Sequence, residues 1–239
     1  MNKPIIIESL FPEIANLFGD RMNIRYLQQC MPDAEFIDTA LTDEPAFATR
    51  DVSMIYMGPM TENQQELVIS VLLPYKERLT ELIKNGCIFL MTGNALEIFE
   101  TYIENEDGSR VDGLGIFPTY AKRDMMHRYN SLVFGEYEGM KLLGFKAQFS
   151  HSYGNNANCY FYKVIRGCGL NPDNMLEGIK ENHFFGTYCV GPFLLLNPLF
   201  VKHLLTLLGI NEPSLAYETT IMESYEKRLA EFENEKLKY

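Results

Sequence analysis

The fold is decided by the stretch IFLMTGNALEIF, which occupies residues 88–99. Residues 87–91 form an apolar run between two glycines, and such a run predicts a buried strand of a parallel sheet. Residues 95–99 predict a helix. Gly93 stands at the turn between them, and glycine adopts a positive φ angle without steric cost. We therefore expect a sharp strand-to-helix turn of the kind that exposes a nucleophile in many hydrolases, but with no side chain at its tip.

Strands and helices alternate on the N-terminal side of this turn. The predicted strands are 5–8, 35–37, 52–57 and 87–91. The predicted helices are 14–18, 24–31 and 62–84, and a further helix is predicted near the end of the chain at 200–208. Pro74 is expected to interrupt the third helix, and Asn197 is expected to serve as N-cap of the last one. The alternation through residue 99 predicts an α/β fold with a mainly parallel central sheet flanked by helices.

The middle of the chain has a different pattern. Residues 104–108 form an acidic loop, and the short apolar runs that follow it predict additional antiparallel strands at 114–117, 131–134, 141–145 and 159–165. After Pro213, apolar residues recur at spacings of three and four, which predicts a terminal helix. Its stripe consists of Met222, Tyr225, Leu229 and Phe232, with Lys236 at the next position. We interpret residues 1–211 as one domain and 212–239 as a C-terminal helical extension that packs on it, with a partner-binding helix as the alternative.

Composition excludes several classes of function. The chain has 239 residues, 46% of them hydrophobic, and a net charge of −11, so nucleic acid is a poor partner. Its five cysteines lack paired spacings, and no CxxC or HExxH motif occurs. We therefore predict reduced thiols, no metal site and no cofactor. The apolar run at residues 5–7 is too short for a signal sequence or a membrane span, and the protein is predicted to be soluble and cytoplasmic.

Three separated stretches share a pattern with one enzyme family. They are LFPEIANLFGDRMNI at 10–24, the stretch at 88–99, and FGTYCVGP at 185–192. Together they resemble class I glutamine amidotransferases of the CobB/CobQ type, most nearly the GatD subunits of lipid II isoglutaminyl synthase. Weaker similarity lies at 111–117 and at 144–148. The resemblance implies the flavodoxin-like fold of that family across most of the chain.

The same resemblance places Gly93 where the family has its nucleophilic cysteine and Val190 where it has its catalytic histidine. Hydrolysis of an amide by this family needs a thiolate and an imidazole that transfers a proton, and neither residue can supply them. The segment 58–60 also replaces the family's glycine-rich oxyanion loop, and Pro59 has no backbone N–H to donate. The sequence therefore predicts no catalytic residues and no glutaminase activity.

Other nucleophiles nearby are poorly placed. Cys189 adjoins Val190, but neighbouring residues of a strand point to opposite faces. Thr92 and Cys87 lie on the elbow strand but not at its turn. His151 with Cys159 is a conceivable pair in a polar, loop-like region.

The predicted function is that of a catalytically inactive amidotransferase-like protein that binds a partner or a ligand. The resemblance implies a Mur-ligase-like synthetase of the MurT type as partner, and glutamine or a related small ligand in the former active site. The predicted ligand pocket consists of Gly58, Asn94, Glu97, Gln148, Arg123 and Arg128. One alternative is an active glutaminase subunit with an atypical nucleophile, which would supply ammonia for amidation of a peptidoglycan precursor. Another is a structural subunit that uses residues 214–239 for contact.

Overall fold

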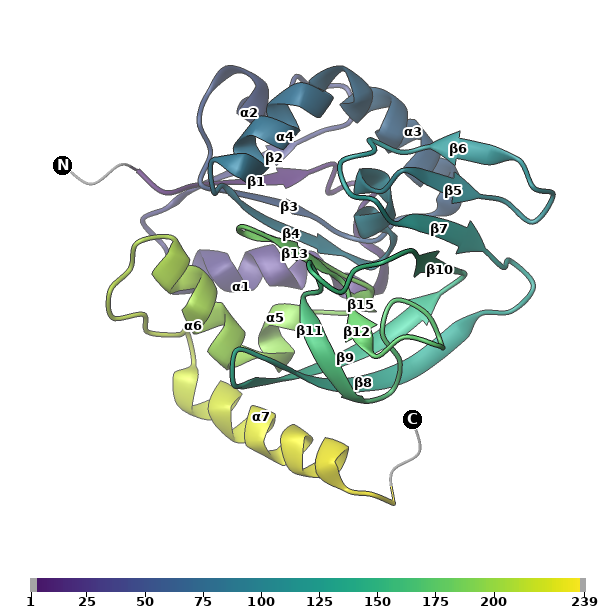
Figure 1. Cartoon of the computed structure of the whole chain (residues 1–239). Helices are drawn as coiled ribbons and strands as arrows, with labels where there is room; N and C mark the ends of the chain where they lie inside the picture. The colour runs from purple at the N-terminus through teal and green to yellow at the C-terminus, as the bar shows by residue number, and fades with distance from the viewer. Residues whose placement is uncertain (1–3, 237–239) are drawn as a thin grey trace.

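The computed structural model describes residues 4–236, so the first three residues of the predicted domain and the last three of the predicted extension lie outside the described residues. The strands of its central sheet are β1 (Ile6–Leu10), β2 (Glu35–Thr39), β3 (Met54–Met57), β4 (Ile88–Thr92), β13 (Ile179–Glu181) and β14 (Phe184–Thr187). They lie in the order β13-β14-β4-β3-β1-β2 (Figure 1). All neighbours pair in parallel except β13 and β14. This order confirms the predicted α/β fold and is that of flavodoxin-like sheets.

Helices cover both faces of this sheet (Figure 1). They are α1 (Met22–Cys30), α2 (Ala46–Thr49), α3 (Glu62–Leu72), α4 (Lys76–Lys84), α5 (Phe193–Leu196) and α6 (Pro198–Leu207). Side chains alternate along β4, so that Phe89 and Met91 pack with α3 and α4, whereas Ile88 and Leu90 pack with α1 and α6. The apolar run at 87–91 is continuous because both of its faces are buried.

The interruption predicted at Pro74 is confirmed, because a 3₁₀ turn, η2 (Leu73–Tyr75), separates α3 from α4. Two other helix predictions are wrong in type. Residues 14–18 form a turn and part of the 3₁₀ segment η1 (Leu17–Gly19), in which Phe18 has a left-handed φ of 60° that breaks α-helical hydrogen bonding. Residues 95–99 belong to the 3₁₀ helix η3 (Gly93–Phe99), which closes with a hydrogen bond from the Glu100 N–H to the Glu97 carbonyl at 3.1 Å.

Two smaller sheets lie beside the central one (Figure 1). The first has the order β10-β7-β5-β6 and the second the order β12-β11-β8-β9-β15. Their strands are β5 (Tyr102–Glu104), β6 (Arg110–Asp112), β7 (Tyr120–Arg123), β8 (Tyr129–Tyr137), β9 (Met140–Gln148), β10 (Ser150–Tyr153), β11 (Tyr162–Arg166), β12 (Leu176–Glu177) and β15 (Cys189–Val190). The runs at 131–134 and 141–145 lie in the antiparallel pair β8–β9, as predicted, and the run at 159–165 becomes a strand from residue 162.

The strand predicted at 114–117 is absent from the described structure. The backbone N–H groups of Leu114, Gly115 and Ile116 donate instead to carbonyls of residues 98–100, at 2.7–3.0 Å. This segment therefore closes the end of η3, and its apolar side chains Leu114 and Phe117 are buried in the main core without joining a sheet.

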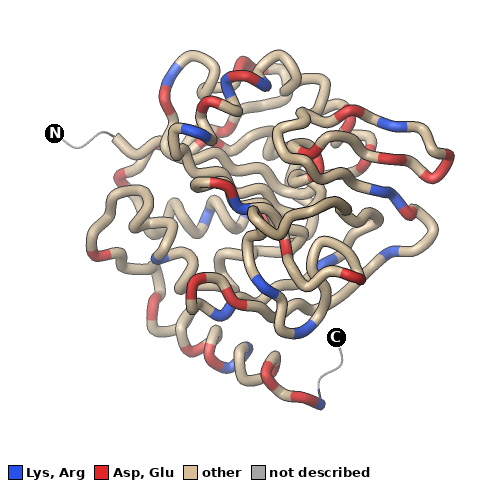
Figure 2. Tube along the Cα trace, viewed as in Figure 1, with Lys and Arg blue, Asp and Glu red and all other residues tan. Residues whose placement is uncertain are grey.

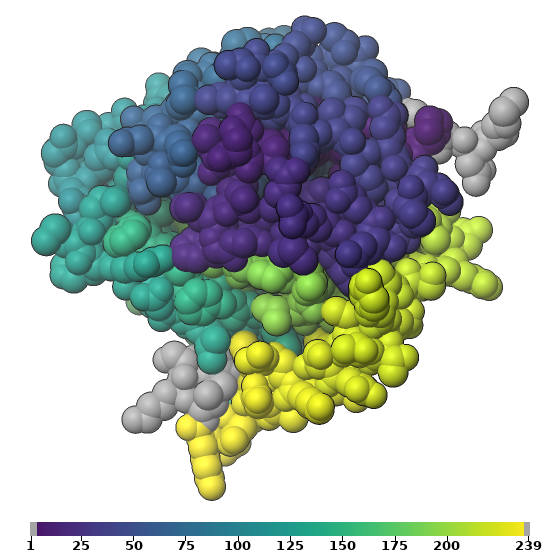
Figure 3. All heavy atoms as spheres, turned by 180° about the vertical axis from the view of Figure 1, so that it is seen from behind, coloured from purple at the N-terminus to yellow at the C-terminus, as the bar shows by residue number. Residues whose placement is uncertain are grey.

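The last helix, α7 (Glu218–Glu233), packs along the outer face of β8 and β9, at the edge of the molecule seen in yellow in Figure 3. Its residues Tyr225 and Phe232 are buried against Phe134 and Leu143. Asn197 precedes α6 in the position of an N-cap, but its side chain hydrogen-bonds the backbone of Leu143 instead of the helix. The apolar stripe of α7 is thus covered by its own domain.

Candidate functional site

Gly93 forms a strand-to-helix elbow at the carboxyl end of β4. Its φ angle is +59°, a conformation that favours glycine. A Cβ atom built on Gly93 would lie 2.6 Å from the Pro59 Cβ and 2.9 Å from the Val190 Cγ1. Real Cβ atoms essentially never approach other atoms that closely, so Pro59 and Val190 fill the space into which a side chain at the elbow would project.

Val190 faces the elbow, whereas its neighbour Cys189 faces away from it. The Cys189 thiol is buried on the other side of β15, 3.1 Å from the Tyr162 hydroxyl. Burial raises the pKa of this thiol to about 11, so it stays protonated at neutral pH. Cys189 therefore offers neither the position nor the ionisation state of a nucleophile.

The other groups considered as substitutes are also engaged elsewhere. The Thr92 hydroxyl donates to the Asp20 carboxylate, and the Cys87 thiol lies 3.4 Å from the Val52 carbonyl. His151 contacts the Gln148 amide at 3.2 Å, and no contact joins it to Cys159 among residues 4–236.

The loop that contains Pro59 is fixed to the elbow by Asn94. The Asn94 Oδ1 accepts from the Met60 N–H at 3.0 Å, and its Nδ2 donates to the Met60 carbonyl at 2.9 Å. The Leu17 N–H donates to the Pro59 carbonyl at 3.0 Å. These bonds hold Pro59, which has no backbone N–H to donate, over Gly93.

A cavity of about 180 Å³ opens beside the elbow. Its apolar lining comes from Leu17, Phe18, Pro59, Met60, Ala147, Phe149 and Val190, together with Gly93. Of the predicted pocket residues, Asn94, Gln148 and Arg128 lie in this lining. Gly58, Glu97 and Arg123 do not, which corrects the predicted pocket.

Glu97 points into the interior instead of the cavity. Its Oε1 accepts from the Tyr188 hydroxyl at 2.8 Å and from the Ser150 hydroxyl, and its Oε2 accepts from Gln65 at 2.8 Å. Burial raises the pKa of Glu97, and its three donors work against that rise. Glu97 therefore ties η3 to β10 and α3.

Arg123 and Gly58 also have structural positions. The Arg123 guanidinium is paired with Glu66 at 2.6 Å and donates to Gln65 at 2.9 Å, and Gln65 in turn donates to the Asn94 carbonyl at 2.7 Å. A Cβ on Gly58 would lie 2.5 Å from the Ala15 carbonyl oxygen, so this glycine permits close backbone approach.

Asp20 lies in the elbow region. In the sequence, its place in the motif LFGDR was the only indication of this. The carboxylate is fully buried and accepts from Thr92 and from the Tyr56 hydroxyl at 3.3 Å. Burial raises its pKa to about 7. Asn23, from the same motif, accepts from the Leu194 N–H at 2.9 Å. The motif thus connects α1 to the strand that carries Gly93 and to the helix after Val190.

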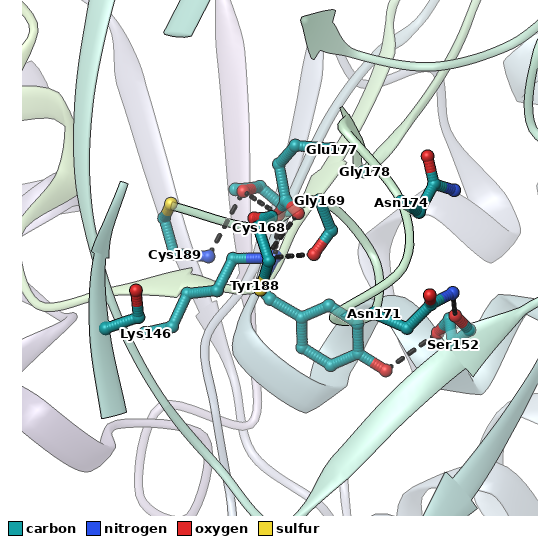
Figure 4. A network of polar contacts seen from close by, with 12 residues as sticks. Lys146, Ser152, Cys168, Gly169, Asn171, Asn174, Glu177, Gly178, Tyr188 and Cys189 are labelled. Atoms are coloured by element: carbon teal, nitrogen blue, oxygen red, sulfur yellow. Dashed lines mark hydrogen bonds and ion pairs between the residues drawn. The ribbon is translucent and has the colours of Figure 1, made fainter. Parts of the chain in front are cut away.

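A second buried network supports the strand that carries Val190 (Figure 4). Lys146 and Glu177 form a fully buried ion pair of 2.5 Å, and the Lys146 ammonium also donates to the carbonyls of residues 168–169. Burial alone would lower the pKa of Lys146, but the adjacent Glu177 carboxylate outweighs it and the pKa is raised. Glu177 in turn accepts from the Thr187 hydroxyl at 2.9 Å and from the Tyr188 N–H at 2.8 Å. The ion pair therefore fixes the backbone that leads into β15.

Residues 4–236 contain no group of three or more His, Cys, Asp or Glu side chains arranged to hold a metal ion. No helix within these residues is long and apolar enough to cross a membrane. Figure 2 shows Lys and Arg interspersed among the more numerous Asp and Glu.

Comparisons with known proteins show which proteins this chain is similar to. No protein-family model matches the chain. It is 22% identical to the lipid II isoglutaminyl synthase (glutamine-hydrolyzing) subunit GatD of Streptococcus pneumoniae, over 84% of this chain and 78% of that protein. It is 25% identical to the Staphylococcus aureus GatD, over 80% of this chain and 78% of that protein.

Solved structures show the same fold. A glutamine amidotransferase superposes with a TM-score of 0.56 at 9% identity, covering 85% of this chain and 99% of that one. A glutamine amidotransferase of Thermotoga maritima superposes with a TM-score of 0.54 at 11% identity, covering 96% and 100%. The chain therefore has the fold of glutamine amidotransferases and is similar in sequence to GatD subunits over most of its length.

Proposed function

We propose that this protein is a catalytically inactive amidotransferase-like subunit that works by binding. The observation that supports this is the filled elbow, because the space of a nucleophile at residue 93 is taken by Pro59 and Val190. A lost cysteine alone could be compensated by a nearby thiol. Here the residue that would transfer a proton and one donor to the oxyanion are absent as well. All three missing groups would lie at this one elbow.

A rescue by another thiol has little support in the structure. An active thiol needs a lowered pKa and access to substrate. Cys189 has a raised pKa and is buried, and burial also raises the pKa of Cys159. The alternative of an active glutaminase with an atypical nucleophile therefore requires a conformation different from the one described.

The partner we propose is a Mur-ligase-like synthetase of the MurT type, because the similar curated proteins are subunits of lipid II isoglutaminyl synthase. The surface of α7 is a poor candidate for this contact, since its apolar stripe is buried against β8 and β9. The mouth of the cavity is better, because its lining residues Leu17 and Phe18 are 38% and 40% exposed.

The test has two independent measurements. Ammonia release from L-glutamine is measured with the purified chain, with and without the Mur-ligase-like protein of the same organism, and the S. aureus GatD with its own partner serves as positive control. We expect no release above a buffer blank and co-elution of the two proteins in size-exclusion chromatography. Glutamine turnover that a glutamine-site inhibitor abolishes would refute inactivity, and separate elution at micromolar concentrations would refute the partner.

A further inference from the structure

The polar groups inside the cavity are already occupied by one another. Asn94 is bonded to Met60 at both ends of its amide, and the Ser150 hydroxyl is bonded to Glu97. The Thr61 hydroxyl is bonded to the Gln64 side chain at 2.9 Å, within a helix capping box. A ligand that enters therefore meets few free donors or acceptors at the floor.

Gln148 differs in having one unpaired oxygen, but that oxygen is not accessible. Its amide nitrogen donates to the Ser150 carbonyl at 2.5 Å, and its Oε1 has no partner but is shut off from solvent. The floor that remains is formed by Pro59, Val190 and Ala147, all apolar. The amide end of glutamine would lose its hydrogen bonds to water there without replacing them, at a cost of about 1–3 kcal/mol.

Two ionic groups at the cavity are unpaired, and they have opposite charge. The guanidinium of Arg128 lies over the rings of Phe18 and Phe149, with its central carbon 5.4 Å and 5.5 Å from their centroids. Within residues 4–236, no acidic group lies within 4.0 Å of the Arg128 guanidinium. No basic group lies within 4.0 Å of the Glu62 carboxylate either. These cation–π contacts attract the guanidinium toward the two rings and do not use its N–H groups as hydrogen-bond donors.

A zwitterion matches this pair of groups, because a carboxylate fits the N–H edge of Arg128 and an ammonium fits the carboxylate of Glu62. The size also agrees, since an apolar cavity of about 150 Å³ is known to hold a benzene molecule. The present cavity of about 180 Å³ therefore accommodates one apolar side chain.

We propose that the vacated pocket binds a free apolar α-amino acid, with the backbone of the ligand between Arg128 and Glu62 and its side chain against Pro59, Val190 and Ala147. This inference rests on the proposed function in one respect, because the ligand is held and not consumed. The filled elbow would thus have changed the ligand class as well as removing the chemistry.

Isothermal titration of the full chain tests this with L-leucine as probe, compared with L-glutamine, with 4-methylpentanoate, which lacks the ammonium, and with 3-methylbutylamine, which lacks the carboxylate. We expect L-leucine to bind at least tenfold more tightly than L-glutamine, and each one-charge analogue to bind at least fivefold more weakly than L-leucine. Binding of glutamine equal to or tighter than that of leucine, or no binding of leucine at millimolar concentration, overturns the proposal.

Variants locate the site. Arg128→Ala and Glu62→Gln should each weaken leucine binding at least fivefold, whereas the exposed controls Arg25→Ala and Glu226→Gln should leave it unchanged. Leucine binding that survives both Arg128→Ala and Glu62→Gln overturns the assignment. Thermal unfolding of each variant shows whether it is folded. Arg128→Lys is a second variant at this position, and it keeps the positive charge but cannot make the two-pronged contact of an arginine with a carboxylate. Ammonia release is measured separately, so failure of this proposal leaves the proposed inactivity intact.

Discussion

Asn94 holds the backbone of Met60 from both sides, accepting from its N–H and donating to its carbonyl. This pair of bonds joins the elbow to the loop that fills it, because Asn94 directly follows Gly93 and Met60 directly follows Pro59. The space at the elbow is therefore filled because Asn94 holds the loop that contains Pro59 in place, as well as because residue 93 is a glycine.

Replacing Asn94 by alanine should lower the free energy of unfolding by about 1–3 kcal/mol, because two polar backbone groups of a buried residue lose their partners. Urea denaturation measures this. The exposed Asn63→Ala on α3 is the matched control and should change the value by less than about 0.5 kcal/mol. Equal effects of the two variants would mean that the bonds to Met60 do not hold the loop.

Restoring the family's catalytic pair should not restore activity. In Gly93→Cys/Val190→His, the new Cβ at residue 93 meets Pro59, and its backbone has a φ angle unfavourable for any residue but glycine. We expect a loss of stability of about 1–3 kcal/mol and no ammonia from glutamine. Adding Pro59→Gly should recover part of that stability. Ammonia release by the double variant would show that the loop moves aside readily.

Stability should fall as the pH rises through the neutral range because of Glu100. Burial, and then repulsion from Glu97, raise the pKa of Glu100 from 4.5 to about 8. Below pH 4.5 both folded and unfolded states carry the proton. Between 4.5 and about 8 only the unfolded state releases it, so the free energy of unfolding drops by up to about 1.4 kcal/mol per pH unit.

Glu100→Gln removes this titration. The difference in unfolding free energy between variant and parent should therefore increase in favour of the variant from pH 5 to pH 8, as measured by urea denaturation at each pH. Taking the difference cancels Asp20, whose raised pKa of about 7 acts in the same direction. Exposed Glu226→Gln should show no such trend. A difference that stays constant with pH would mean that Glu100 ionises normally.

Removing only one partner of the Lys146–Glu177 ion pair should strongly lower the free energy of unfolding. Lys146→Met leaves a fully buried carboxylate without its cation and should destabilise the fold by about 3–5 kcal/mol. Lys146→Met/Glu177→Leu removes both charges and should recover a large part of that loss. Chemical denaturation of both variants, with exposed Lys163→Met as control, tests this. A double variant no more stable than Lys146→Met would show that hydrogen bonds, and not charge, dominate.

The sequence predicted β1, β3 and β4 because these strands are buried on both faces, as the run at 87–91 illustrates. It did not predict β14, which joins the same sheet and is equally buried. It also placed Gly93 and Val190 at one site, and a Cβ atom built on Gly93 would lie 2.9 Å from the Val190 Cγ1. It failed at 114–117, where apolar residues suggested a strand but their N–H groups bond to η3.

Sequence alone could not separate Asn94, which lines the cavity, from Glu97, which does not. The two are three residues apart on a 3₁₀ helix, and only the positions of Ser150 and Tyr188, from distant strands, decide that Glu97 turns inward. The role of Asp20 was equally hidden, because it depends on Thr92, which is 72 residues away.

The close approach of Pro59 and Val190 also bears on how such a site could evolve. Cysteine introduced at residue 93 by a single mutation would meet both side chains, and this clash would lower the stability of the fold. The packing around the elbow therefore opposes any one-step change that places a side chain at position 93, and such a change would need a second mutation at Pro59 or Val190 to make room for it.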